Sequence, residues 1–264
     1  MADGADAGAK ARAWAPASLT LTAGRDKSGR PEAGDVVLRP GEITALLGPT
    51  GSGKSRFLSD IESLACGDTP TGRRLLLDGR SPDADERFEL QGRLVAQLTQ
   101  NMNFVLDLSV RDFVLTHALS REAPDPQEAA RRVIAAANSL AGEPFDPGVQ
   151  LTQLSGGQSR ALMIADTALL SWSPALLIDE IENAGVDKRR ALDLLLASDK
   201  IVVIATHDPV LALSADRRLV FEHGAVRMTV VRTGEERDIL ARLSEMERET
   251  TRVRALLRKG EPLS

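Results

Sequence analysis

The chain has 264 residues, of which 42% are hydrophobic, so it is long enough to build one large domain, or a domain with a subdomain, around a sizeable core. Its net charge of −5 offers no general basic field for nucleic acid, and we expect no nucleic-acid partner. The acidic start has no apolar signal segment, the single cysteine fits a reducing compartment, and no apolar stretch approaches the ~18 to 20 residues that span a bilayer.

The first motif in chain order is a glycine-rich loop between a predicted strand and a predicted helix. The apolar run 43–47 indicates a buried strand, and residues 57–61 can continue as helix. The loop between them fits the P-loop pattern in full and consists of Gly48, Pro49, Thr50, Gly51, Ser52, Gly53, Lys54 and Ser55. Its backbone N–H groups can cradle phosphates, Lys54 can reach the terminal ones, and the Ser55 hydroxyl can ligate Mg²⁺.

A second candidate phosphate site follows a stretch of helices. Residues 109–140 read as helices broken at 123–126, and residues 142–150 read as a loop. Strong helix formers then occupy 159–170, so a helix begins at or just after Ser155, Gly156 and Gly157. A helix start favours an anion, because its first N–H groups are unpaired and its dipole is positive there. A plain capped turn is the alternative, and the P-loop favours the phosphate site.

Two acidic residues end a second buried strand. The continuous apolar run 175–178 indicates a parallel strand covered on both faces, and ligands of open α/β sheets gather beyond such strand ends. Asp179 is therefore expected to hold Mg²⁺, while Glu180 points to the other side of the strand and suits a base for an attacking water. The alternatives are that the two acids merely end the strand, or that Glu182 is the base.

A histidine ends a third buried strand, residues 201–206. His207 in this position is predicted to hydrogen-bond a terminal phosphate or the attacking water. His117 and His223 lie in no comparable setting and are expected to be ordinary surface or capping residues. Further on, apolar residues among many charges over 235–257 predict an amphipathic helix, which we expect to pack on its own domain rather than bind a partner.

These motifs, in this order, resemble those of the ATP-binding cassette (ABC) ATPases, of the type that forms the nucleotide-binding subunit of ABC transporters. The resemblance covers residues 19–228. It identifies residues 48–55 as the Walker A loop and Asp179 as the end of the Walker B strand, with Glu180 as general base and His207 as the switch histidine. It also implies that Gln100 senses Mg²⁺ and the attacking water, with Gln97 as a weaker candidate. The signature motif is then Leu154, Ser155, Gly156, Gly157 and Gln158.

The resemblance also implies a fold and a domain organisation. The fold is an α/β P-loop NTPase core with a mainly parallel sheet, an antiparallel β subdomain and an inserted α-helical signature subdomain. We expect a flexible segment over 1–17, the ATPase domain over 18–228 with the helical subdomain at about 101–158, and a C-terminal amphipathic helical extension over 229–264.

In this family, two cassettes sandwich two nucleotides, and each signature motif faces the phosphate held by the opposite Walker A loop. This chain carries each motif once, so the resemblance implies ATP and Mg²⁺ as cofactors and a second, identical or similar cassette as partner. A membrane transporter with separate membrane-spanning permease subunits is the favoured role, which places the protein in the cytoplasm or at the inner face of the cell membrane. The alternative is a soluble ATPase that assembles or remodels a protein or a metal cofactor.

Two segments depart from the family pattern. Residues 19–30 lack the aromatic residue that usually stacks on adenine, and Arg25 or Trp14 is the candidate replacement. The loop 181–187 after Glu180 is one residue longer than the usual Pro-Thr-Ser-Ala-Leu-Asp-like segment, so contact with the second cassette is expected to differ there.

Overall fold

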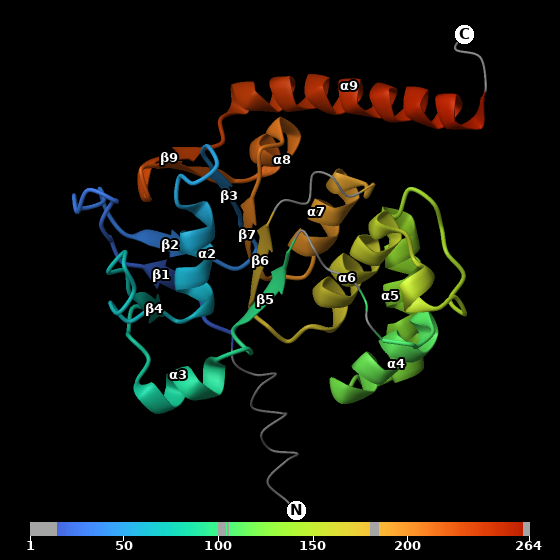
Figure 1. Ribbon diagram of the computed structural model, residues 1–264, viewed down its shortest axis with the longest axis horizontal. Helices are drawn as coiled ribbons and strands as arrows, with labels where there is room; N and C mark the ends of the chain where they lie inside the picture. The colour runs from blue at the N-terminus through green and yellow to red at the C-terminus, as the bar shows by residue number, and fades with distance from the viewer. Residues whose placement is uncertain (1–14, 100–103, 105, 180–184, 261–264) are drawn as a thin grey trace, which may run out of the picture.

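The computed structural model describes residues 15–99, 104, 106–179 and 185–260, and its centre is a six-stranded sheet (Figure 1). The strand order is β5-β6-β7-β3-β8-β9. All neighbours are parallel except β8 and β9, which form an antiparallel hairpin. The strands are β3 (Ile43–Leu47), β5 (Val95–Leu98), β6 (Ala175–Asp179), β7 (Ile201–Ala205), β8 (Arg217–Glu222) and β9 (Ala225–Val231).

A smaller antiparallel sheet lies beside the large one. Its order is β2-β1-β4, and its strands are β1 (Leu19–Leu21), β2 (Val36–Leu38) and β4 (Leu75–Leu77). Each strand buries its first and third residues and leaves the middle one half-buried, which is the alternation of a sheet with one face on a core.

Helices cover both faces of the large sheet. In Figure 1, α2 (Lys54–Glu62) lies between the two sheets, and α6 (Gly156–Leu170) and α7 (Lys188–Leu196) lie on the opposite side. The remaining helices are α3 (Ala84–Leu90), α4 (Val110–Ser120), α5 (Pro126–Leu140), the short 3₁₀ turn η1 (Leu151–Gln153), α8 (Pro209–Ser214) and α9 (Gly234–Lys259). No helix in the described ranges is both long and apolar enough to cross a membrane.

The large sheet separates two hydrophobic cores. Successive strand residues point to opposite faces, so Ala45 and Ile178 pack with the helices α4 to α7, whereas Leu46 and Leu177 pack with α2 and the small sheet. These apolar strands are buried on both faces, as their unbroken hydrophobic runs predict. The predicted fold class is confirmed: a mainly parallel sheet, an antiparallel β unit and a helical unit that contains the start of α6.

Local signals explain the helix boundaries. Asp125 caps α5 by accepting the Glu128 N–H at 2.9 Å, and Pro126 follows at the first helical position, so the chain breaks between α4 and α5 where the sequence predicts. The predicted C-terminal helix is α9, which begins at a Thr233–Glu236 capping box and ends at Gly260 in the left-handed conformation. In Figure 1, α9 runs across the top of the molecule.

Candidate functional site: a phosphate-binding edge of the sheet

Three parallel strands bring their carboxyl ends to one edge of the large sheet. β7 lies between β6 and β3, and the Cα of Ala205 is in register with Asp179 on one side and with Leu46 on the other. The loop after Leu47, the side chain of Asp179 and the segment after Ala205 therefore start from one line across the sheet. Open α/β sheets bind ligands at such an edge, between strands whose connections diverge.

The loop 48–55 has a backbone that only glycine permits at two points. Gly48 and Gly53 have φ values of +145° and +115°, in the left-handed half of the conformational map. A Cβ on Gly48 would lie 2.6 Å from the carbonyl oxygen of Phe221, and one on Gly53 would lie 2.7 Å from the Cα of Gly224. The loop thus packs closely against the end of β8 and against the β8–β9 turn at Gly224.

Lys54, near the end of the loop 48–55, has a buried side chain that contacts the start of the same loop. Its Nζ donates hydrogen bonds to the carbonyl oxygens of Gly48 at 2.6 Å and Pro49 at 3.3 Å. Ser55 is exposed, whereas the Ser52 hydroxyl is buried and has no hydrogen-bond partner in the structure. Helix α2 starts at this loop, and its N-cap residue, Gly53, provides no side-chain cap. The loop therefore combines a buried cation, a helix N-terminus and an unsatisfied hydroxyl, which together favour a phosphate.

Two contacts to the loop are not predicted by the motifs. Lys27 donates from its Nζ to the carbonyl oxygen of Gly51 at 2.8 Å, and its backbone N–H donates to the carbonyl of His223 at 2.8 Å. The N–H of Gly224 donates to the carbonyl of Ser52 at 2.7 Å. No pattern in the sequence pairs these residues, because they come from three segments that are distant along the chain.

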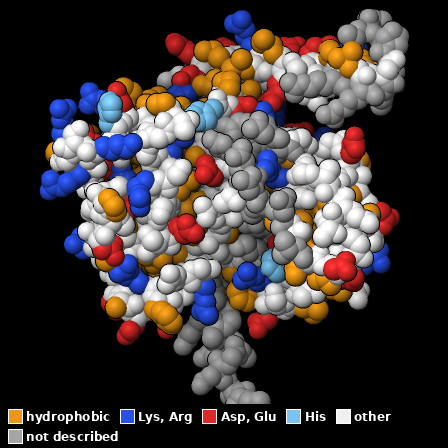
Figure 2. Space-filling view, viewed as in Figure 1, with side chains coloured by type: hydrophobic (Ala, Val, Ile, Leu, Met, Phe, Trp, Pro, Cys, Tyr) orange, Lys and Arg blue, Asp and Glu red, His pale blue; other side chains and the backbone are white. Residues whose placement is uncertain are grey.

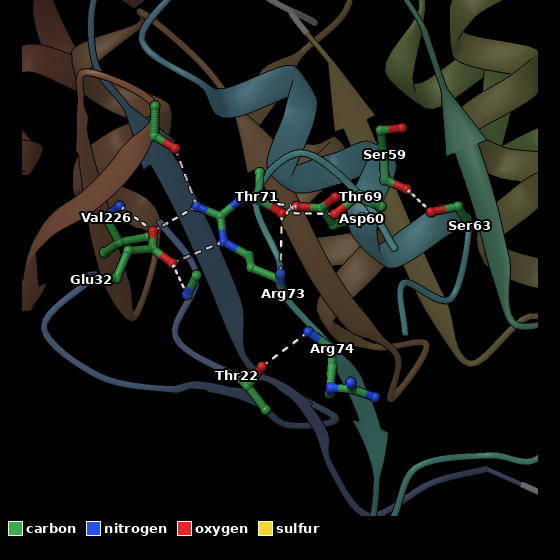
Figure 3. Close-up of polar contacts among 12 residues, drawn as sticks. Thr22, Glu32, Ser59, Asp60, Ser63, Thr69, Thr71, Arg73, Arg74 and Val226 are labelled. Carbon is green, nitrogen blue, oxygen red and sulfur yellow. Dashed lines mark hydrogen bonds and ion pairs between the residues drawn. The ribbon is translucent and has the colours of Figure 1, made fainter. Parts of the chain in front are cut away.

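A buried arginine, Arg73, contacts the turn between β8 and β9 (Figure 3). Arg73 has only 1% of its side chain exposed. Its guanidinium donates to both carboxylate oxygens of Glu32, at 2.9 and 2.5 Å, and to Asp60 Oδ2 of α2 at 2.9 Å. It also donates to the carbonyl of Gly224 at 3.3 Å. We call Glu32, Asp60 and Arg73 the Arg73 cluster; it joins the segment between β1 and β2, the segment before β4, helix α2 and the β8–β9 turn.

The charges in the Arg73 cluster are stabilised by their partners. Burial favours the neutral form of Glu32, but hydrogen bonds from Arg73 and from the backbone N–H groups of Val226 and Gly24 lower the pKa of its carboxyl below the usual 4.5. Burial also opposes the charge of Arg73, yet the two carboxylates raise its pKa above the ordinary value. Glu32 and Arg73 are therefore held in their charged forms by their mutual hydrogen bonds.

The Ser-Gly-Gly segment lies where a second anion could approach from solvent. Ser155 is the N-cap of α6: its Oγ accepts the Gln158 N–H at 3.3 Å, and Gln158 Oε1 accepts the Ser155 N–H at 2.9 Å. Gln158 also donates to the carbonyl of Glu143 at 3.2 Å. Ser155 and Gly156 are exposed, and a Cβ on Gly156 would meet nothing within 4 Å. This capping box leaves the side of the helix start that carries Gly156 open.

Some of the remaining predicted site residues have described positions in the structure, and others lie outside the described residues. Asp179 ends β6 and is half-buried, and His207 is exposed two residues beyond the end of β7. Glu180 and its alternative Glu182, as well as Gln100, lie outside the described residues, as does Trp14. Gln97 is half-buried within β5, where its Cα is in register with Leu177.

The other two histidines occupy different settings. His223 is exposed in the β8–β9 turn with a φ of +52°. His117, expected to be a surface or capping residue, lies in the last turn of α4, and its Nδ1 is 2.7 Å from Oδ2 of Asp166, a buried residue of α6. His117 therefore joins two helices of the helical unit, a role that its sequence neighbourhood does not indicate.

The donor set at this edge suits Mg²⁺ bound together with phosphates. Mg²⁺ in such sites takes one or two protein oxygens and fills its other positions with phosphate oxygens and water. Ser55 and Asp179 carry oxygens of this kind, at the start of α2 and at the end of β6, and would be the residues to hold the ion. No cluster of three or more His, Cys, Asp or Glu side chains suited to a metal occurs among the residues with described positions.

Comparisons with known proteins identify the family of the chain. The sequence model of the ABC transporter family matches residues 34–183. An uncharacterized ABC transporter ATP-binding protein of Methanocaldococcus jannaschii is 47% identical over 247 residues, which cover 93% of this chain and 94% of the relative. The macrolide export ATP-binding/permease protein MacB of Brucella abortus is 32% identical over 72% of this chain, which spans only 30% of MacB.

Solved structures share the fold. CbiO1 of Clostridium perfringens, part of the ABC transporter complex CbiONQ, superposes with a TM-score of 0.59 at 22% identity and covers 91% of this chain and 94% of CbiO1. A dimeric ATP-binding cassette bound to ADP and phosphate superposes with a TM-score of 0.58 at 22% identity, covering 82% and 99% of the two chains. The fold and the P-loop define a nucleotide-binding protein of the P-loop class. Within that class, the chain belongs to the ABC transporter family, as an ATP-binding cassette.

Proposed function

We propose that this chain is a Mg²⁺-dependent ATPase that works as a dimer of cassettes. The observation that carries the proposal is the rigid loop 48–55 on the same sheet edge as Asp179 and His207, with the open start of α6 elsewhere on the same chain. The functional unit is the ATPase domain 18–228 with its helical subdomain at about 101–158. Residues 1–17 and the extension 229–264 lie outside that unit.

Each residue of the edge has a proposed task. The backbone N–H groups of residues 48–55 hold the β- and γ-phosphates, and the ammonium of Lys54 turns from its own loop carbonyls to the terminal phosphate. Ser55, Asp179 and Gln100 hold Mg²⁺, which neutralises charge on the phosphates when bound. Arg25, exposed next to the loop contact made by Lys27, is the candidate for stacking on the base.

Hydrolysis needs a base for the attacking water. The water oxygen forms a bond to the γ-phosphorus, the bond from that phosphorus to the β–γ bridging oxygen breaks, and the water proton passes to the Glu180 carboxylate. His207 donates a hydrogen bond to the γ-phosphate and keeps this phosphate aligned with the attacking water. ADP leaves with the bridging oxygen, and inorganic phosphate is the second product.

The second cassette completes each site. Ser155 and Gly156 are exposed at the start of α6, so we propose that the segment Ser155, Gly156, Gly157 and Gln158 contacts the γ-phosphate held by the partner's loop. The partner is a second copy of this chain or a similar subunit.

We propose that the closure of two cassettes around ATP drives transport across a membrane. The names of the relatives support a transporter with separate membrane-spanning permease subunits, with this chain cytoplasmic or peripheral at the inner face of the membrane. MacB itself carries its permease on the same chain as its ATP-binding part, according to its name. The alternative is a soluble ATPase that remodels a protein or metal cofactor. The long helix α9, which lies beyond the cassette, supports this alternative.

Affinity isolation from gentle detergent separates these two roles. Tagged Glu180→Gln protein, held closed with ATP, is expected to recover a multi-span membrane protein, and open Lys54→Ala protein is the matched control. Recovery of soluble proteins alone, with the same set from both variants, would contradict the transport role. ATPase activity is tested separately: wild-type protein is expected to release phosphate from ATP only when Mg²⁺ is added, and EDTA should stop it.

A further inference from the structure

One lysine joins three segments that are far apart in the chain. Lys188 is the first residue of α7, and its Nζ donates to Asp208 Oδ2 at 2.5 Å and to Glu247 Oε1 at 2.7 Å. The two acceptors lie 20 and 59 residues further along the chain, in the N-cap of α8 and in the middle of α9. A single ammonium group therefore connects α7, α8 and the C-terminal helix.

Asp208 fixes the backbone directly after His207. Its Oδ1 accepts the N–H groups of Val210 at 2.8 Å and Leu211 at 3.0 Å, which caps α8, and its own N–H donates to Thr206 Oγ1 at 3.0 Å. The other carboxylate oxygen is the one that Lys188 contacts. Because both oxygens have partners, the orientation of the segment 206–208 depends on the position of the lysine.

Lys188 also follows the loop that begins at Glu180. Asp187, the N-cap of α7, accepts the Arg190 N–H at 3.1 Å and ends that loop. Lys188 is the next residue. The contact between Lys188 and Asp208 therefore links the segments that follow two neighbouring strands of the site, β6 and β7.

The setting of these charges makes the contact more than a surface ion pair. The side chains of Lys188 and Asp208 are only 16% and 14% exposed, and Glu247 is 37% exposed. Burial opposes the charge of Lys188, but its hydrogen bonds to Asp208 and Glu247 raise its pKa above the usual 10.5, so the ammonium is charged at neutral pH. Partly buried charges are screened less by water and salt than exposed ones.

The contact with Glu247 lies near the middle of a helix that is otherwise well exposed. Figure 2 shows apolar, acidic and basic side chains mixed along α9 at the top of the view. Ile239 and Met246 of α9 are 49% and 66% exposed, so apolar packing covers these two residues only in part. The ion pair of Lys188 with Glu247 joins the middle of α9 to α7 and, through Asp208, to the segment that follows β7.

We propose that Lys188 is a positioning residue for His207, and that Glu247 makes this positioning depend on the docking of α9. The inference rests on the proposed role of His207 in ATP hydrolysis. It gives the C-terminal helix a function: a force or ligand that lifts α9 from α7 and α8 loosens the segment after β7 and slows hydrolysis. The affinity for ATP is expected to stay unchanged, because the loop 48–55 follows a different strand, β3, and is held by separate contacts such as that of Lys27.

The test separates turnover from binding in the full-length protein. Lys188→Met is expected to lower kcat about tenfold and Glu247→Gln about threefold, with KM for ATP changed less than about twofold. Lys188→Arg retains a charge that can reach both carboxylates and should recover most of the turnover. Glu249→Gln is the matched control, since it removes the same charge two residues away, where the Glu249 side chain is 63% exposed and pairs with Arg252 at 3.7 Å.

His207→Ala, assayed in parallel, tells the two claims apart. Turnover of His207→Ala at the wild-type rate would overturn the proposed role of His207 itself. If His207→Ala is inactive while Lys188→Met and Glu247→Gln turn over normally, the role of His207 stands and the positioning by Lys188 and α9 is wrong. An equal loss in Glu249→Gln would also contradict it. If Lys188→Met does not fold, the comparison of Glu247→Gln with Glu249→Gln decides.

Discussion

The two glycine-rich segments that we propose to contact phosphate are built in opposite ways. The loop 48–55 is held from three sides, by Lys27, by the turn at Gly224 and, behind that turn, by the Arg73 cluster. The start of α6 is held by its own capping box and one contact to the carbonyl of Glu143, and the space in front of Gly156 is open. The first segment thus has many contacts within the chain, whereas the second is open to solvent, which fits our proposal that it approaches a phosphate held by another cassette.

The largest expected effect comes from removing the ion cluster behind the first site. Arg73→Met leaves two buried carboxylates without their cation, so it should lower the free energy of unfolding by about 3 to 5 kcal/mol. Chemical denaturation checks this value. Arg80→Met is the control, because Arg80 pairs with Glu86 at 2.6 Å on the exposed surface and should change little. Equal stability of the two variants would mean that the Arg73 cluster does not support the loop.

The contrast between the two glycine sites can be tested with one methyl group. Gly53→Ala places a Cβ 2.7 Å from the Cα of Gly224 at a φ of +115°, and should cost about 2 to 4 kcal/mol of stability and most of the ATP affinity. Gly156→Ala meets open space, so it should fold with wild-type stability and bind ATP normally as a monomer. Thermal melting and nucleotide titration measure both. Similar losses in the two variants would remove the contrast.

A smaller effect should appear as a dependence of stability on pH. The pKa of Glu32 is lower in the folded protein than its usual 4.5, so its ionised form stabilises the fold above that pH. As the pH falls below 4.5 toward the lowered pKa, the unfolded chain takes up the proton first and this stabilisation is lost. Chemical denaturation from pH 6 to pH 3 should show that the free energy of unfolding falls less steeply in Glu32→Gln than in wild type. Parallel plots of this free energy against pH would contradict the lowered pKa of Glu32.

Local patterns predicted most of the fold. The unbroken apolar runs of β3, β6 and β7 are sufficient to indicate buried parallel strands, and the capping residues Asp125 and Ser155 mark the starts of α5 and α6. The loop 48–55 could be identified because each phosphate contact requires a particular residue at a fixed spacing.

The supports of the site were not predictable in the same way. Arg73, Lys27 and the pair His117–Asp166 act through contacts between segments that are distant in sequence, and a single charged residue carries no local signal of its partner. The same holds for the tie from Lys188 to Glu247, since the amphipathic pattern of α9 predicts a helix but not where it docks. The roles of Gln100 and Glu180 rest on the sequence, because both residues lie outside the described parts of the structure.

We propose that the open helix start of one chain completes the P-loop site of another, so ATP should drive dimerisation of the protein. Glu180→Gln protein with ATP and Mg²⁺ should double its mass in light scattering, and the same protein with Ser155→Arg added should bind ATP but stay monomeric. The bulky cation at Ser155 blocks the approach of a partner's phosphate without touching the loop 48–55. A dimer of unchanged strength in the double variant would contradict the account.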